Sequence, residues 1–179
     1  VYNGPYCGFL LAQAGARVIK VESPKGETLR GRGNPISGSF PFAMLNGGKE
    51  CITLNIKNLQ GQQLLKQLVM HADVLVENFA PGTLAEYGLG SDDLRALNPR
   101  LIYAASTGYG SSGPYRDYLG MDITLQAMSG IMSVTGADDG PPMKAGAALC
   151  DFLGGVHLYA GITSALYQRE QTGLGAVLD

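Results

Sequence analysis

Residues 73–79 (DVLVENF) and 101–107 (LIYAAST) decide the fold of this chain. Both are short runs of mostly apolar and β-branched residues, a composition typical of strands. An amphipathic helix is predicted at 60–71, where four apolar residues share one helical face. Apolar strands that alternate with helices pair in parallel and are covered by helices on both faces. The two runs therefore predict an α/β fold built on a parallel sheet.

The same alternation extends outward from these runs in both directions. Further strands are predicted at 17–22, 51–56 and 176–179, and further helices at 4–14, 81–90, 92–97, 122–134 and 152–170. The segment 23–48 is rich in Gly and Pro and predicts a loop. Ligands of parallel sheets bind beyond the carboxyl ends of the strands. We therefore expect the functional residues in the loops that follow the strands.

Composition excludes several classes of function. The chain has 179 residues, enough for one domain with a sizeable core. Its net charge is −2 and only 16% of its residues are charged, which argues against a nucleic-acid binder. The three cysteines and two histidines have no spacing typical of a metal site or a disulfide framework. We therefore expect no metal and a reducing, cytoplasmic location.

Asp151 is the one charged residue in the apolar stretch 145–168. A buried charge is costly unless it is paired, so this carboxylate needs a reason. Two interpretations stay open: an N-cap for a helix that begins at Phe152, or a carboxylate held in a dry site as base or nucleophile. Asp122 has the same ambiguity, with N-capping favoured. The uncharged run 152–168 predicts a buried core helix rather than a membrane span.

Two further patterns have simpler explanations. Residues 108–113 match the dinucleotide-binding pattern G-x-G-x-x-G after a strand, but no apolar helix and no later acidic strand end follows. This argues against a nicotinamide or flavin site. A basic cluster at positions 17, 20, 25, 30 and 32 could hold phosphates, but interspersed glutamates favour a solvated face.

An ordered set of short motifs spans the whole chain. The motifs are GPY at 4–6, GARVIKVE at 15–22, NGGK at 46–49, ADVLVENF at 72–79, LNPRLIY at 97–103, GYG at 108–110, GPY at 113–115, MD at 121–122, DF at 151–152 and TGLG at 172–175. Together they resemble the class III CoA-transferase family (CaiB/BaiF-like). This family includes formyl-CoA and carnitine CoA-transferases and the 2-methylacyl-CoA racemases.

The resemblance implies a Rossmann-like large domain with helices on both faces of its sheet. Residues 1–179 would form a single large-domain fragment, somewhat under half of the usual family length. The small domain, the returning C-terminal segment and a glycine-rich loop of the family would be absent. The family's subunits interlock in pairs, so the resemblance also implies a homodimer.

The resemblance implies a function for Asp151. It aligns with the family's aspartate nucleophile, which attacks an acyl-CoA thioester to give a mixed anhydride and then an aspartyl-CoA thioester. CoA would move to a carboxylic acid, with acyl-CoA as substrate and no permanently bound cofactor. Two alternatives remain: a truncated, non-catalytic CoA-binding or dimerisation module, and an acyl-CoA racemase. The racemases carry a His where this chain has Met121, which cannot move a proton, so a transferase is favoured.

The resemblance also implies the residues that contact CoA. They are Val1, Tyr2, Asn3, Leu54, Lys57, Asn78 and Phe79, with Arg30 and Lys57 as phosphate partners. Asp122 matches an acidic position near the active-site loop and is a candidate active-site acid. The chain departs from the formyl-CoA transferases at Ser23 and Glu86, where they carry Arg, and at Thr107, where they carry Lys. These departures weaken a formyl or oxalate assignment.

Overall fold

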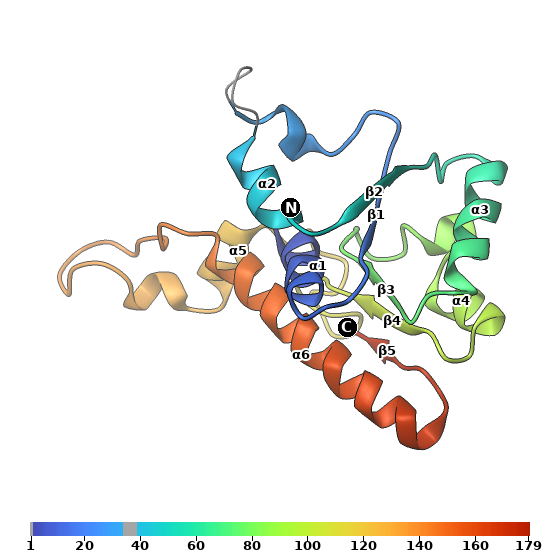
Figure 1. Ribbon diagram of the computed structural model, residues 1–179. Coiled ribbons are helices and arrows are strands. Elements are labelled where there is room, and N and C mark those ends of the chain that lie inside the picture. Colours follow the sequence, from blue (N-terminus) through green and yellow to red (C-terminus); the bar gives the residue numbers. More distant parts are fainter. Residues whose placement is uncertain (1, 34–38) are drawn as a thin grey trace.

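The chain folds around two parallel sheets (Figure 1). The computed structural model describes residues 2–33 and 39–179. One sheet pairs β1 (Ile19–Glu22) with β2 (Glu50–Thr53). The other has the order β3 (Val74–Glu77), β4 (Ile102–Ala105), β5 (Val177–Leu178). The α/β class and the parallel pairing are confirmed.

The strands divide between two parallel sheets, a division that the sequence pattern does not indicate. The apolar pattern identifies each strand but not the strand to which it hydrogen-bonds. β4 is buried along most of its length, whereas Ile19 and Val21 of β1 are more than a third exposed. The three-stranded sheet is therefore the centre of the molecule, and the β1–β2 pair lies at its margin.

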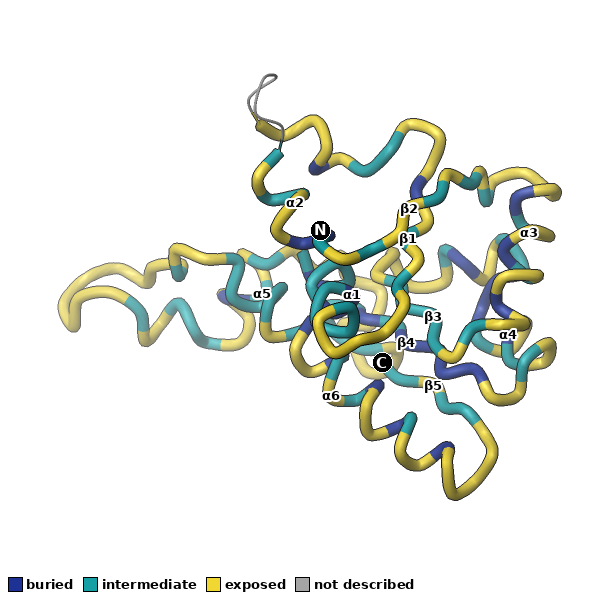
Figure 2. The backbone as a smooth tube through the Cα atoms, viewed as in Figure 1, coloured by how far each residue is buried: buried dark blue, intermediate teal, exposed yellow. Residues whose placement is uncertain are grey.

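Helices cover both faces of the three-stranded sheet, as predicted. Tyr103 joins a core cluster with Leu65 and Val69 of α3 (Leu59–Val69) and Leu94 of α4 (Ser91–Leu97). Ile102 and Ala104, its neighbours on β4, join the opposite cluster, formed with α1 (Asn3–Gln13) and α6 (Leu149–Thr172). Figure 2 shows buried backbone concentrated along β4 and on the helix faces that pack against it. The alternation of side chains along one strand thus builds two cores.

The predicted loop 23–48 contains a helix. α2 spans Phe40–Asn46, and a 3₁₀ turn, η1, spans Thr28–Gly31. The Ser39 side chain caps α2 by accepting a hydrogen bond from the Phe42 N–H at 3.3 Å. Pro41 stands in the first turn, where a missing N–H costs nothing. The Gly and Pro content of the surrounding segment concealed this short helix.

Two predicted helices are shorter than expected. The predicted helix 122–134 ends early: α5 covers Asp122–Met128, and a 3₁₀ turn, η3, covers Ile131–Val134. Gly130 between them has a φ of 83°, which an α-helix does not accommodate. In 81–90 only Ala85–Tyr87 (η2) is helical, and it is 3₁₀. The segment from α5 to α6 extends away from the sheets (Figure 1).

α6 is the longest helix and begins earlier than predicted, at Leu149. Leu158, Ile162 and Ala165 lie in the core, whereas Leu153, Val156 and Tyr167 are exposed, so the predicted core helix is buried along one face only. By length and composition α6 could cross a membrane, and 22% of its most apolar 18-residue window is buried. In this fold one face packs against α1 and β4.

Candidate functional site

The site forms where the first turn of α1 meets the first turns of α6. Gly154 and Gly155 allow this approach because neither has a side chain. A Cβ at Gly155 would lie 2.8 Å from the Asn3 carbonyl oxygen and 3.1 Å from a ring carbon of Tyr6. A Cβ at Gly154 would collide with the Asn3 amide. The glycine pair after Asp151 therefore sets the contact between the two helices.

Asp151 stands in the first turn of α6, as the third residue of the helix. The N-cap is Ala148, so the N-cap interpretation of Asp151 is wrong. Its Oδ2 accepts a hydrogen bond from the Tyr2 backbone N–H at 3.0 Å. The Tyr2 ring stacks on Phe152 with centroids 5.8 Å apart. A carboxylate in the first turn is also favoured by the helix dipole.

Asp122 caps a helix, but the helix is α6 rather than its own. It is the first residue of α5, whose N-cap is Met121. Its Oδ1 accepts hydrogen bonds from the backbone N–H groups of Cys150 at 2.8 Å and Asp151 at 3.1 Å. These are N–H groups that a helix leaves without an internal partner. Asp122 thereby fixes the backbone on which Asp151 stands.

Gln126 extends this arrangement and was missed by the sequence analysis as a site residue. It is fully buried. Its Nε2 donates to Asp122 Oδ2 at 2.7 Å, and its Oε1 accepts from the Ala145 N–H at 2.8 Å. Nε2 also lies 3.3 Å from the Ala147 carbonyl oxygen. A polar side chain at a core-facing position of a helix was the available signal, because buried amides need partners.

A surface hollow of about 510 Å³ lies beside Tyr2 and Phe152. α2, the start of α5, the segment before α6 and the start of α6 contribute its lining. The lining residues are Tyr2, Phe40, Pro41, Met44, Met121, Asp122, Ile123, Lys144, Gly146, Ala147, Ala148 and Phe152. The walls are mostly apolar, and Lys144 is the cationic residue among them. Asp151 is not itself a lining residue, but it bonds to Tyr2 and precedes Phe152, which both line the hollow.

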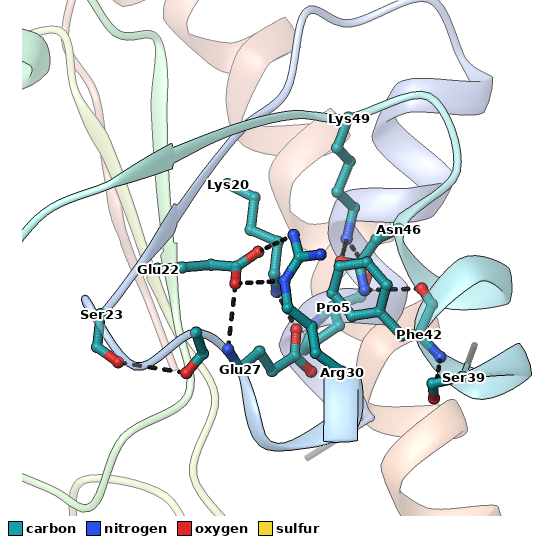
Figure 3. A network of polar contacts seen from close by, with 11 residues as sticks. Pro5, Lys20, Glu22, Ser23, Glu27, Arg30, Ser39, Phe42, Asn46 and Lys49 are labelled. Carbon is teal, nitrogen blue, oxygen red and sulfur yellow. Dashed lines mark hydrogen bonds and ion pairs between the residues drawn. The ribbon is translucent and has the colours of Figure 1, made fainter. Parts of the chain in front are cut away.

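A second polar cluster holds α2, one wall of the hollow, in place (Figure 3). Arg30 forms a bidentate salt bridge with Glu22: its Nε donates to Oε2 at 2.7 Å, and its Nη2 donates to Oε1 at 2.8 Å. Its guanidinium also lies 4.0 Å over the Phe42 ring of α2. The hydrogen bonds from Arg30 lower the pKa of the Glu22 carboxyl. We call Lys20, Glu22, Glu27, Arg30 and Phe42 the Glu22 network.

Lys49 ties the same helix to α1. Its Nζ donates to the Pro5 carbonyl oxygen at 2.7 Å and to Asn46 Oδ1 at 3.0 Å, a contact drawn in Figure 3. Burial lowers the pKa of Lys49 to about 8. Because α1 carries Tyr2 and α2 carries wall residues of the hollow, this side chain connects the two sides of the site.

In the predicted basic cluster Lys20 is mostly buried, whereas the residues at positions 17, 25, 30 and 32 are exposed. Lys20 pairs with Glu27 at 2.5 Å, and both side chains are mostly buried. Arg17 pairs with Glu50 at 2.9 Å on the surface. The interpretation of this cluster as a solvated face is therefore wrong for Lys20. Arg30, predicted as a phosphate partner, has its guanidinium engaged by Glu22 and Phe42.

The residues predicted to contact CoA fall into two groups. Tyr2 and Asn3 begin α1 beside α6, and Asn78 packs against Gly4 while its Nδ2 donates to the Ser106 carbonyl oxygen. Phe79, which follows Asn78, is half exposed. Val1 lies outside the described residues.

The other group follows the β1–β2 sheet. Leu54 is half-buried against the core cluster of α3 and α4. Lys57 is exposed in the loop after β2, where its N–H bonds to Asn55 Oδ1 at 3.1 Å. The structure thus brings Tyr2, Asn3 and Asn78 together around the start of α1, and leaves Leu54 and Lys57 at the other sheet.

The glycine-rich loop after β4 is held by the end of β5. Thr107 Oγ1 donates to Asp179 Oδ1 at 3.2 Å and accepts from the Gly110 N–H at 2.9 Å. The Ser111 N–H also bonds to the Asp179 carboxylate. No helix begins until Asp122, so the loop lacks the helix N-terminus that a dinucleotide site uses. Within residues 2–33 and 39–179, no group of three His, Cys, Asp or Glu side chains is placed to bind a metal.

Comparison with known proteins gives one consistent result. The family model for CoA-transferase family III matches residues 1–179. The chain is 46% identical to formyl-CoA:oxalate CoA-transferase of Streptomyces avermitilis, over 98% of this chain and 43% of that protein. It is 43% identical to succinate–glutarate CoA-transferase of Agrobacterium fabrum, over 100% of this chain and 47% of that protein.

Solved structures agree with the sequence comparison. A CaiB/BaiF family protein from Brucella suis superposes with a TM-score of 0.96 at 41% identity. The match covers 100% of this chain and 49% of that one. The chain therefore spans a little under half the length of these relatives.

Proposed function

The chain belongs to CoA-transferase family III, and from this premise we propose that it supplies the nucleophile for transfer of CoA from an acyl-CoA to a carboxylic acid. The observation that carries the proposal is the Asp151 carboxylate, held by the Tyr2 N–H beside a mostly apolar hollow. A carboxylate fixed by backbone donors in such a site is suited to covalent catalysis.

The proposed reaction proceeds through covalent intermediates on Asp151. Its carboxylate attacks the thioester carbonyl of the donor, giving an aspartyl–acyl anhydride and releasing CoA thiolate. The thiolate attacks the aspartyl carbonyl, which gives an aspartyl-CoA thioester and frees the donor acid. The acceptor carboxylate attacks this thioester to form a second anhydride and thiolate. The thiolate then attacks the new acyl carbonyl, releasing the product acyl-CoA and restoring Asp151.

The surrounding residues act by positioning. Asp122 and Gln126 hold the first turn of α6, and therefore the Asp151 backbone, in a fixed place. Tyr2 holds one carboxylate oxygen from the opposite side. A nucleophile that is already oriented loses little freedom when it reacts. The apolar walls limit the water that would hydrolyse an anhydride.

We extend the substrate class of the relatives to this chain. The two relatives described above are named for oxalate, succinate and glutarate, which are all dicarboxylic acids. CoA would run from Asp151 past Asn78 and Phe79, with Lys57 toward its phosphates. Ser23, Glu86 and Thr107 differ from the formyl-CoA transferases, so we favour a longer dicarboxylic acid over oxalate.

The complete activity needs more polypeptide than these residues provide. Two large apolar side chains of the hollow, Phe40 and Met121, are each at least two thirds exposed. Such side chains indicate a surface that another segment or subunit covers. We propose a homodimer in which residues beyond this chain close the site.

Trapping of the intermediate tests the proposal. The protein is incubated with an acyl-CoA and then with hydroxylamine, which converts an aspartyl anhydride or thioester into an aspartyl hydroxamate. Mass spectrometry should find the hydroxamate at Asp151, and Asp151→Ala should abolish it. A hydroxamate that persists in Asp151→Ala would move the nucleophile elsewhere. CoA binding without any hydroxamate would favour a non-catalytic CoA-binding module.

A further inference from the structure

The lining of the hollow carries one carboxylate, Asp122, and one ammonium group, Lys144. Both carboxylate oxygens of Asp122 accept hydrogen bonds from N–H groups. Lys144, the cation of the lining, has its Nζ 3.3 Å from the carbonyl oxygen of its neighbour Ala145. Within the described ranges 2–33 and 39–179, no carboxylate pairs with it. The hollow therefore offers one ammonium group to an anionic ligand.

The backbone beside Lys144 is held by the same residue, Gln126, that supports the position of Asp151 through Asp122. The buried Gln126 binds the Ala145 N–H and the Ala147 carbonyl oxygen, so it holds the backbone next to Lys144. Gln126 also binds Asp122, which holds the Asp151 N–H. Lys144 and Asp151 are thus anchored to one buried side chain. Apolar residues, including Phe152 and Ile123, line the hollow to which Lys144 also contributes.

We propose that Lys144 Nζ binds the second carboxylate of a dicarboxylic acyl group whose first carboxyl reacts at Asp151. The inference rests on the proposed function. A carboxylate and an ammonium form a charge-assisted hydrogen bond, which is stronger in a mostly apolar site than in water. The methylene groups of the ligand would lie along the apolar walls. Lys144 is in this assignment a specificity-determining residue and takes no part in bond making.

Matched acyl donors test the assignment. Succinyl-CoA and butyryl-CoA have acyl chains of equal length, and only the first carries a second carboxylate. Lys144→Met should lower kcat/KM for succinyl-CoA by about 30-fold, the loss of one charge-assisted hydrogen bond. For butyryl-CoA it should change kcat/KM by less than about twofold. Lys144→Arg should keep most of the preference for succinyl-CoA.

A control and a second readout separate the possible outcomes. Lys25→Met removes the same charge from an exposed loop and should leave both donors unaffected. Equal losses with both donors would overturn the assignment and indicate that Lys144 binds a CoA phosphate. Equal activities of Lys144→Met and the unaltered protein with both donors would overturn it too.

The trapped hydroxamate distinguishes this inference from the proposed function. If butyryl-CoA yields a hydroxamate at Asp151 in both proteins, and only the succinyl-CoA yield falls in Lys144→Met, the assignment is supported. If the succinyl-CoA yield is unchanged, the assignment fails and the proposed function stands. If neither donor yields a hydroxamate in the unaltered protein, both fail.

Discussion

The Glu22 network and the surroundings of Asp151 both concentrate charge, but they satisfy it differently. In the network, side chain pairs with side chain: Glu22 with Arg30, and Lys20 with Glu27. Around Asp151, the carboxylates are held by N–H groups of the backbone and of Gln126. The two side chains of each ion pair neutralise each other's charge, and the pairs stabilise the fold. N–H groups at the starts of α6 and α1 instead orient the carboxylates of Asp122 and Asp151, respectively.

The largest expected effect comes from removing the nucleophile. Asp151→Asn should reduce transferase activity by about 10⁴-fold or more, because an amide cannot form the anhydride. The Asn oxygen can still accept the Tyr2 N–H, so thermal unfolding should change little. Steady-state assays beside a melting curve measure both. If Asp151→Asn kept a tenth of the activity, the nucleophilic role would be contradicted, and Asp151 would have a structural role like that of the Glu22 network.

The approach of α1 to α6 gives the next effect. Gly155→Ala should destabilise the fold by about 2 kcal/mol, because the new methyl group meets the Asn3 backbone. It should also lower activity, since α1 carries the Tyr2 N–H. Gly161→Ala is the matched control in the same helix: its Cβ would meet only Leu178, at 3.5 Å. Urea unfolding should find the control as stable as the unaltered protein, or more so.

Removal of the cap on α6 should cost somewhat less. Asp122→Ala leaves the Cys150 and Asp151 N–H groups without their acceptor, and about 1.5 kcal/mol of stability should be lost. Asp122→Asn keeps an acceptor oxygen and should recover most of the stability. Activity that follows stability across the two variants would fit a positioning role. Loss of activity in a fully stable Asp122→Asn would instead support the predicted role as an active-site acid.

The smallest effect is expected in the Glu22 network and should depend on pH. Arg30 lowers the pKa of Glu22 in the folded chain, so this carboxylate stabilises the fold above its unfolded pKa. That contribution is lost as the pH falls through the folded pKa. Glu22→Gln should cost about 1 kcal/mol at neutral pH and progressively less in acid. Urea unfolding of Glu22→Gln and of the unaltered protein, at neutral and at acidic pH, measures this cost in stability. A cost that does not depend on pH would contradict this assignment.

The fold was predictable where periodicity is strong. The runs around β3 and β4 and the amphipathic pattern of α3 gave the correct elements, because each element buries one continuous face. The division into two sheets was not predictable, since it depends on which strand edges meet. α2 was missed because a seven-residue helix among Gly and Pro has almost no periodicity. Its stability comes from the Ser39 cap and from Arg30 over Phe42.

The site was predictable only in its most unusual residue. Asp151 was conspicuous as a lone charge in an apolar stretch, and the motif resemblance implied its role. One partner of its carboxylate, a backbone N–H far away in sequence, could not be deduced from residue types. For the same reason Gln126 and Lys144 were not identified. Gln126 matters through its bonds to Asp122 and Ala145, and Lys144 through its place in the lining of the hollow.

Oxygen-isotope transfer tests the nucleophilic role of Asp151 most directly. During turnover with a carboxylic acid acceptor labelled with oxygen-18, one acceptor oxygen becomes the bridging atom of the second anhydride. When CoA thiolate attacks the new acyl carbonyl, that oxygen stays on the aspartate. The peptide containing Asp151 should therefore gain one oxygen-18 atom in the first turnover and approach two as turnover continues, because each cycle replaces one carboxylate oxygen. Full turnover with no label in that peptide would contradict the assignment of Asp151 as the nucleophile.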